Sequence, residues 1–504
     1  MARLENLPFF VILACLAAAA MMLPAIYAVT VNDHATARAF FYSSILFLVL
    51  SGFIAVATAN YDVRRQGRSH LISMLAFFAV LPAALAVPFR EAVPDTSFVN
   101  AYFEMVSSLT TTGFTLFDAD RLPPAVHLWR ASVAWLGGFF VWVTAIAILA
   151  PLNLGGFEVA STAEVGQGAS VSMGQIDRVA DPAERLRRYT WSLFPLYLSL
   201  TIVLWIGLIA AGDAPLIAIC HAMSTLSTSG ISPIGGAEFA GSGWRGEVLI
   251  FLFFIFAISR VTFASDDRSD GWRTMLIDPE LRFGLIIILA LPVLLFARHY
   301  AGAVEGEIEV TLREGLAGLW GGLFTVTSFL TTTGFVSTAW GEARAWSGLA
   351  TPGLLLMGLA FFGGGVATTA GGVKLLRVYA LWKHGVRELE KLVMPSSVGG
   401  SGQQARRFRR QGAYVAWVFF MLFGMSVALV MIALSLTGLD FEEATVVTIA
   451  ALSTTGPLSE IASDDPVALA SLGTTAKAII SAAMVLGRLE TLAIIALINP
   501  EFWR

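Results

Sequence analysis

Long apolar stretches recur along the chain and are separated by shorter polar segments. Nearly charge-free windows of about 20 residues cover 7–28, 40–59, 71–88, 191–211 and 415–436. As a helix, each is long enough to cross a hydrocarbon core of about 30 Å. The pattern therefore predicts an all-α polytopic membrane protein.

A short motif of the form Leu-[Ser/Thr]-Thr-[Ser/Thr]-Gly lies between these stretches four times. The copies end at Gly113, Gly230, Gly334 and Gly456, at intervals of roughly 100 to 120 residues, which predicts four repeated units. The hydroxyl residues of the copies are Thr110, Thr111 and Thr112; Ser227, Thr228 and Ser229; Thr331, Thr332 and Thr333; and Ser453, Thr454 and Thr455.

Each motif follows a short apolar segment, such as 98–109 in the first unit, and is flanked by two longer ones. A helix of about 11 residues rises about 16 Å, half the depth of the membrane, and about five extended residues return the same distance. We therefore expect each unit to run span, re-entrant pore helix, motif and span. The third pore helix, near 315–330, is the least clear.

Two further apolar spans precede the units, so the sequence predicts ten crossings, with both termini on one side of the membrane. The expected limits are 1–65 for the N-terminal pair and 66–155, 156–265, 266–382 and 383–504 for pore units 1 to 4. Within the units, the expected spans lie near 71–89 and 131–151, 190–211 and 245–264, 282–297 and 349–377, and 413–436 and 471–497.

The charged residues differ between the two sides of this arrangement. Only 13% of the chain is charged and 56% is hydrophobic, whereas soluble domains carry roughly 25% charged residues, which excludes a typical soluble enzyme. The expected motif-side loops are mainly acidic and the opposite loops mainly basic, including 383–410. The positive-inside rule puts the basic side and both termini in the cytosol, and an acidic outer mouth concentrates cations.

The motifs offer hydroxyl and backbone carbonyl oxygen but no ionisable group, which suits binding of a hard cation. Glycine allows the backbone to turn its carbonyls toward one axis, and four such loops replace the hydration shell of a monovalent ion. The alternative is that each glycine only caps a helix. Four copies in equivalent positions favour an ion-selectivity filter formed by the motifs. The partially negative C-terminal ends of the pore helices would then point at this filter.

Other classes of site find little support in the sequence. Cys15 and Cys220 lie in apolar stretches and have no metal-ligand spacing, so we expect two inert buried thiols. No phosphate loop, metal cluster or nucleophile arrangement stands out. A polytopic membrane enzyme and a structural membrane scaffold remain as alternatives of other classes, and we expect the protein not to be an enzyme.

With the motifs, the stretches 362–374, 486–490 and 500–504 make the chain resemble the Trk/Ktr/HKT superfamily of potassium transporters, most closely TrkH-type membrane subunits. The resemblance implies potassium uptake across the bacterial cytoplasmic membrane, a homodimer with one pore per subunit, and a cytosolic TrkA-type nucleotide-binding regulatory subunit. It implies no cofactor in this chain, because potassium is the substrate.

The resemblance also bears on ion selectivity. Plant relatives with serine at the position of Gly113 transport sodium, so glycine in all four motifs favours potassium. The second motif continues with Ile231 instead of an aromatic, and the fourth has Ser and Thr where asparagine is frequent. The nearest alternative is a sodium transporter, or a potassium transporter coupled to sodium or protons, with the same architecture.

A run of small residues interrupts the second span of unit 3. From the residues alone, close helix packing through small side chains is the stronger reading. The resemblance instead implies an intramembrane loop that obstructs the pore below the filter and acts as a gate. The residues concerned are Gly363, Gly364, Gly365, Thr368, Thr369, Gly371 and Gly372.

Arg488 lies within the last apolar stretch, where a charge is functional by default. Snorkelling to the cytosol is the alternative. The resemblance implies that Arg488 faces the conduction path and forms an electrostatic barrier beside the gate. Lys477 is expected to be a structural ion-pair partner, and His221 a packed polar residue. The basic loop 383–410 is expected to be a positive-inside anchor, with docking of the regulatory subunit as the family's suggestion.

Overall fold

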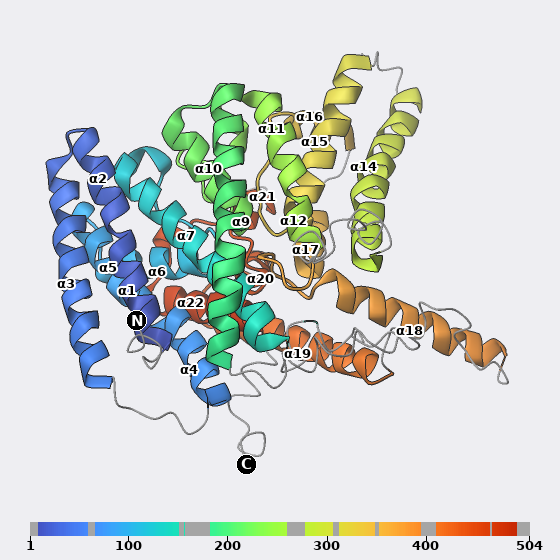
Figure 1. Ribbon diagram of the computed structural model, residues 1–504. Helices are drawn as coiled ribbons and strands as arrows, with labels where there is room; N and C mark the ends of the chain where they lie inside the picture. Colours follow the sequence, from blue (N-terminus) through green and yellow to red (C-terminus); the bar gives the residue numbers. More distant parts are fainter. Residues whose placement is uncertain are drawn as a thin grey trace.

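The computed structural model describes residues 9–58, 66–150, 156, 182–259, 278–305, 312–347, 352–394, 410–463 and 466–490. Within these ranges all regular secondary structure is helical, so the expected all-α class is confirmed. Figure 1 shows the helices as a packed bundle, with α18 running out from the body at one side.

The chain begins with an antiparallel pair of apolar elements. The first element consists of α1 (Phe9–Ala20) and α2 (Met22–Thr30). The second is α3 (His34–Thr58), which runs back along both helices. Large apolar side chains of α3 such as Phe53 and Val56 are exposed. An exposed apolar surface of this kind fits a lipid-facing position.

The remaining helices follow the order expected for four units. Units 1 and 2 contain α4 (Gln66–Ala79), α5 (Leu81–Ala92), α6 (Phe98–Leu109), α7 (Pro124–Thr144), α9 (Pro182–Ala211), α10 (Pro215–Ser227), α11 (Gly243–Phe253) and α12 (Ile255–Ile258). Units 3 and 4 contain α14 (Pro279–Glu305), α15 (Leu312–Leu330), α16 (Trp340–Ser347), α17 (Pro352–Phe362), α18 (Leu375–Val393), α19 (Arg410–Ser435), α20 (Phe441–Ser453), α21 (Leu458–Ile461) and α22 (Thr474–Leu489).

Seven described segments are long and apolar enough to cross a membrane: Phe10–Thr30, His34–Thr58, Leu71–Ala92, Pro124–Leu149, Glu184–Ala211, Pro279–Ala297 and Gly412–Ser435. The other three expected spans are shorter or broken. The span near 245–264 is divided between α11 and α12, and the one near 349–377 ends as a helix at Phe362. α22 is described as a helix to Leu489, and 491–497 lie outside the described residues.

The limits expected between units fall at different kinds of position. Those at 65, 155 and 265 lie outside the described residues. The limit between 382 and 383 falls inside α18, a continuous helix. The terminal stretch 500–504 and most of the basic loop after Val393 also lie outside the described residues.

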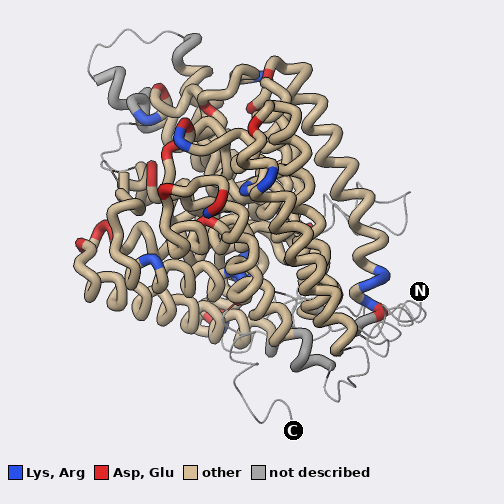
Figure 2. The backbone as a smooth tube through the Cα atoms, turned by 90° about the vertical axis from the view of Figure 1, so that its left-hand side faces the viewer, with Lys and Arg blue, Asp and Glu red and all other residues tan. Residues whose placement is uncertain are grey.

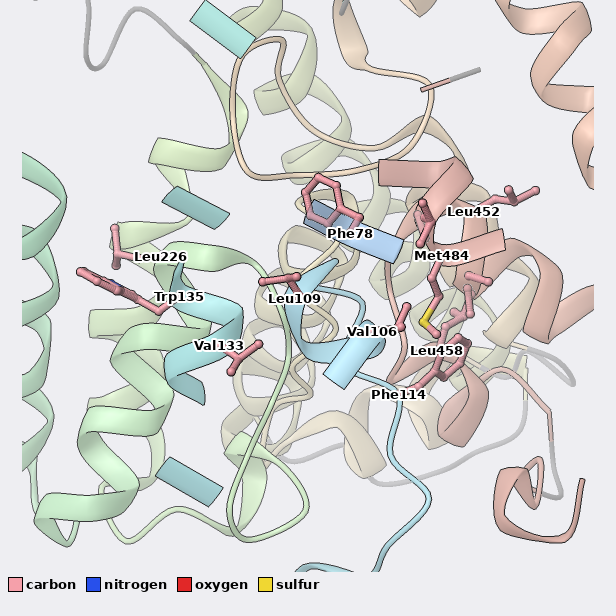
Figure 3. Packing of buried hydrophobic residues seen from close by; sticks show 14 of the residues in the cluster. Phe78, Val106, Leu109, Phe114, Val133, Trp135, Leu226, Leu452, Leu458 and Met484 are labelled. Carbon is pink, nitrogen blue, oxygen red and sulfur yellow. The ribbon is translucent and has the colours of Figure 1, made fainter. Parts of the chain in front are cut away.

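The core joins the ends of the pore helices. The motif leucines Leu109, Leu226 and Leu452 belong to one hydrophobic cluster that also holds Phe114 and Met484, and Figure 3 shows these side chains among the packed helices. Figure 2 shows that most of the chain along the described helices carries no charge. Apolar packing therefore fixes the four motifs with respect to one another, and the few buried charges stand out.

Candidate functional site

All four pore helices end at the motif. α6 ends at Leu109, α10 at Ser227, α15 at Leu330 and α20 at Ser453. The motifs thus lie at the C-terminal, partially negative ends of four helices. We call residues 110–113, 227–230, 331–334 and 453–456 motif loops 1 to 4.

The middle threonine of every motif loop has left-handed backbone geometry. Its φ is 54° at Thr111, 53° at Thr228, 59° at Thr332 and 56° at Thr454. This region is disfavoured for β-branched residues, so a conformation repeated four times must be held by its surroundings. The threonines, and not the glycines two residues later, turn the chain out of the helix. This weighs against the alternative that the glycines only serve as helix caps.

Two hydrogen bonds recur in all four motif loops. The N–H of the residue after the middle threonine donates to a carbonyl of the pore helix, at 2.9, 3.0, 2.9 and 2.8 Å in loops 1 to 4. The first and third hydroxyls of each loop bond to each other, at 2.8, 3.1, 3.1 and 3.2 Å. The first and third side chains therefore fix the shape of each loop.

The remaining oxygens are the ones available to a cation. All hydroxyl residues of the motif loops are at most 1% exposed. In the part of the chain that the structure describes, the hydroxyls of Thr111 and Thr454 are buried without a hydrogen-bond partner. Together with backbone carbonyls, they are oxygen ligands of the kind that a hard cation prefers.

The four glycines close the loops into a ring. A Cβ atom on Gly113 would overlap the carbonyl oxygen of Ser229, and one on Gly230 would overlap that of Thr333. A Cβ on Gly334 would press on Pro457 in unit 4. Each contact reaches from one unit to the next, which needs close backbone approach and explains the glycine.

The ring is completed between units 4 and 1. The N–H of Gly456 donates to the carbonyl of Thr112 at 2.5 Å, and a Cβ on Gly456 would overlap the backbone nitrogen of Phe114. The loops therefore contact one another in the cyclic order 1, 2, 3, 4 and back to 1. The structure brings all the expected motif residues together at one place.

In three units the side chain five residues before the motif leucine braces the loop through the segment that follows the motif glycine, which the sequence reasoning did not anticipate. Glu104 accepts a bond from Leu116 N at 2.5 Å, His221 bonds Ser232 Oγ at 2.9 Å, and Thr325 Oγ1 accepts from Ser337 N at 3.4 Å. The equivalent residue of unit 4 is Val447, which cannot form such a bond. Aligning the four repeats by their motifs would have revealed this polar position.

Buried carboxylates strengthen two of these braces. Glu104 forms an ion pair with Arg130 at 3.0 Å, and the two side chains are 0% and 4% exposed. Glu247 of α11 accepts hydrogen bonds from Ser337 Oγ at 2.7 Å and Thr338 N at 2.6 Å, beyond motif loop 3. Each acid has several donors, as a buried charge requires.

Residues 363–374, which we call the Gly-rich loop, interrupt the second span of unit 3. Backbone φ is positive at Gly363, Ala367, Gly372 and Lys374, which a continuous helix does not allow. The span is interrupted as expected, and its glycines also allow the close packing that was the alternative, since a Cβ on Gly365 would overlap Ile258 O. The loop is anchored where Gly365 N and Thr368 Oγ1 donate to Ala257 O, at 2.9 and 3.2 Å.

The Gly-rich loop lies directly against motif loops 3 and 4 and against the end of the pore helix that precedes motif loop 2. Thr369 Oγ1 donates to the carbonyl of Leu226 at 3.1 Å, and Gly371 N donates to Thr332 Oγ1 at 2.8 Å. A Cβ on Gly371 would overlap the carbonyl oxygen of Ser453. The Gly-rich loop is therefore in direct contact with the ring.

Arg488 is buried beside the Gly-rich loop. It is 7% exposed, and its Nε and Nη2 have no hydrogen-bond partner within the described residues. It lines a cavity of about 30 Å³ together with Gly371, Gly372, Lys374 and Glu490. Burial at this position argues against snorkelling to the cytosol.

Two more cations lie near Arg488. The ammonium of Lys374 donates to the carbonyl of Ala370 within the Gly-rich loop. Arg377 pairs with Glu490 at 2.8 Å, and its guanidinium lies 3.7 Å from the centre of the Phe419 ring. Below the ring, the three cationic side chains therefore lie near two carboxylates, Glu490 and Glu280, the second of which accepts a hydrogen bond from Val366 N of the Gly-rich loop at 2.6 Å.

Two other expectations concerned Lys477 and His221. Lys477 donates to Asn100 Oδ1 and to Ala470 O, each at 3.0 Å. The expected ion pair is wrong, because two neutral oxygens satisfy the ammonium. His221 is a buried, packed polar residue as expected, and it also braces motif loop 2.

Carboxylates follow two of the motif loops. Glu238 follows motif loop 2, and Glu460 follows motif loop 4. Burial, together with the negative charges of Glu460 and Glu247, raises the pKa of Glu238 from 4.5 to about 7. These acidic groups are thus close enough to one another to interact electrostatically.

A family model described as TrkH, cation transport protein, matches residues 37–237 and 315–503. The chain belongs to the TrkH family. The Trk system potassium uptake protein TrkH of Salmonella typhimurium is 29% identical to it over 96% of both chains. The protein of that name from Halomonas elongata is 31% identical over 86% of this chain and 84% of its own.

A solved structure agrees with this membership. The crystal structure of the potassium transporter TrkH from Vibrio parahaemolyticus matches with a TM-score of 0.80 and 25% identity, covering 99% of both chains. The expected resemblance and the polytopic membrane fold are confirmed. The TrkH relatives are named as transporters and not as enzymes, so the expectation of a non-enzyme is also confirmed.

Proposed function

We propose that this protein takes up potassium across the bacterial cytoplasmic membrane, with the four motif loops as its selectivity filter. The closed ring of glycine contacts carries the proposal. A potassium ion loses its water at the ring and is held by backbone carbonyls and by the hydroxyls of Thr111 and Thr454. The potassium-uptake names of the TrkH relatives support the choice of ion.

The Gly-rich loop and Arg488 form the gate of this proposal. The loop contacts motif loops 3 and 4 and the end of the pore helix that precedes motif loop 2. Arg488 lines the cavity beside this loop, and its Nε and Nη2 have no hydrogen-bond partner among the described residues, so a cation that leaves the filter meets a buried positive charge. Opening requires the loop to move away and Arg488 to be displaced or screened.

The setting of this pathway also belongs to the proposal. The acidic mouth around Glu238 and Glu460 faces outward, and both termini lie in the cytosol. The functional unit is a homodimer with one pore in each subunit. Each subunit consists of the two N-terminal helices and the four pore units. A cytosolic TrkA-type nucleotide-binding subunit regulates opening. The basic segment 383–410 anchors the chain on the cytosolic side, and it is also the region where we place docking of this subunit.

Growth rescue tests the proposal. A bacterial strain that lacks its potassium uptake systems is transformed with this chain, alone and with the cognate cytosolic subunit, and grown at low external potassium. We expect rescue that is stronger with both subunits. Rescue that depends on external sodium at fixed potassium would identify a coupled transporter, and sodium uptake without rescue would identify the sodium alternative.

A further inference from the structure

The residue directly after the motif glycine differs between the units in both type and position. It is Phe114, Ile231 and Phe335 in units 1 to 3, and these side chains are 1, 2 and 1% exposed. In unit 4 it is Pro457, which is only half-buried. Three of these side chains are thus buried in the protein, whereas the fourth is not.

Pro457 lies inside the ring of glycines. A Cβ on Gly334 would lie 2.9 to 3.0 Å from three atoms of the proline ring. A Cβ on Gly230 would lie 2.7 Å from its Cγ, and one on Gly113 would lie 3.6 Å from its Cδ. These glycines belong to units 1, 2 and 3, so Pro457 of unit 4 lies at the place in the ring where all three approach it.

The proline is held firmly at this place. It precedes α21, and its φ of −58° is the angle that its ring imposes. The hydroxyl of Ser459 donates to Gly456 O at 2.9 Å, and Glu460 N donates to Pro457 O at 3.1 Å. Val467 N then donates to Ser459 O at 3.1 Å, tying the turn to the next segment.

We infer that Pro457 is a specificity-determining residue at the outer end of the filter, an inference that rests on the proposed function. Its ring has no polar atom, and proline has no backbone N–H. It displaces water from the space between the glycines and offers the ion no new ligand there. A cation must lose water before it reaches the filter oxygens, which costs the more strongly hydrated sodium ion more than potassium.

Replacement of the ring tests this directly. Purified Pro457→Ala is reconstituted into proteoliposomes, and rubidium and sodium uptake are measured separately. We expect the sodium-to-rubidium uptake ratio to rise about tenfold. Pro233→Ala, which changes a buried proline beyond motif loop 2, keeps the ratio of the unmodified protein. A ratio in Pro457→Ala equal to that in Pro233→Ala would overturn the inference.

A pair of double variants tests the contact itself. The three atoms nearest to the Cβ of Gly334→Ala all belong to Pro457, whereas the Cβ of Gly113→Ala overlaps the backbone of Ser229. Each single variant should therefore lose at least about tenfold in rubidium uptake. Adding Pro457→Ala should restore uptake about threefold to Gly334→Ala and not to Gly113→Ala.

Two results separate this inference from the proposed function. Equal behaviour of both double variants would contradict the placement of Pro457 in the ring, even if the single Pro457→Ala variant folds poorly. Absence of rubidium uptake by the unmodified protein would instead contradict the proposed function. Rubidium uptake with an unchanged sodium ratio in Pro457→Ala contradicts the inference alone.

Discussion

Motif loops 1 and 4 have almost the same sequence but are held in place differently. Loop 1 is braced from its own pore helix by Glu104, which is itself paired with Arg130. Loop 4 has Val447 at the equivalent position. It is fixed instead by the bond from Gly456 N to Thr112 O and by Ser459. The fourth repeat therefore closes the ring through a hydrogen bond to the backbone of the first.

The difference shows which part of the repeat the ring needs. The left-handed threonine and the hydroxyl pair occur in every loop, whereas the brace, the residue after glycine and the sign of the glycine φ vary. Gly113 has a φ of +84°, and Gly456 is not among the glycines with positive φ. The features common to all four loops form the oxygen-lined ring. The features that vary between units fix the loops in position.

The largest loss of uptake is expected from replacing the motif glycines of loops 1 and 4. Gly113→Ser and Gly456→Ala each place a Cβ over a backbone atom of the neighbouring unit. We expect each to lower rubidium uptake in proteoliposomes at least about a thousandfold, or ~4 kcal/mol. Normal uptake by Gly456→Ala alone would show that unit 4 does not close the ring as described.

The braces should differ in their contribution to stability. Glu104→Gln leaves Arg130 buried without its carboxylate and should lower the free energy of unfolding by about 3 kcal/mol. Ser459→Ala removes one neutral hydrogen bond from loop 4 and should cost about 1 kcal/mol. Thermal unfolding in detergent measures both, and equal costs would contradict the difference between the loops.

The second spans of units 1 and 4, α7 and α22, differ in the side chain that they place below the ring. Val141 and Arg488 line the same cavity below the ring, and only the latter is charged. Arg488→Gln should raise rubidium uptake without the regulatory subunit about tenfold, because the electrostatic barrier is removed. Lys477→Gln changes a cation on the same helix that has neutral partners, and should leave uptake unchanged. The gate assignment fails if Arg488→Gln alters neither uptake nor its regulation.

The smallest effect is expected at the outer mouth. As the pH falls through about 7, Glu238 gains a proton, and rubidium uptake at low ionic strength should fall about twofold. Since its pKa is raised on folding, ionisation of Glu238 lowers stability as the pH rises from 4.5 to about 7. Glu238→Gln should therefore unfold at a higher temperature than the unmodified protein at pH 8, and its uptake should lose this pH dependence.

Much of this arrangement could be predicted from the sequence, because it rests on local patterns. The repeated Leu-Ser/Thr-Thr-Ser/Thr-Gly motif located all four loops, and the glycines of 363–372 located the interruption of a span. Hydropathy located most of the long helices. The backbone geometry of Thr111 and its equivalents required the structure, because a strained threonine looks the same in sequence as any other.

The contacts between units were not predictable from local patterns. Pro457 reads as the start of a turn, and nothing near it in the sequence shows that it approaches Gly113, Gly230 and Gly334. Lys477 was misassigned because its partners, Asn100 and Ala470, are neutral. Such partners are set by packing between distant segments, which hydrophobic periodicity does not record.

Ion competition at the filter tests the central claim most directly. Proteoliposomes that contain the purified chain take up radioactive rubidium in the presence of excess unlabelled potassium or excess unlabelled sodium. The closed ring of four motif loops predicts that potassium suppresses rubidium uptake and that sodium at the same concentration leaves it nearly unchanged. Equal suppression by the two ions would contradict a potassium-selective filter.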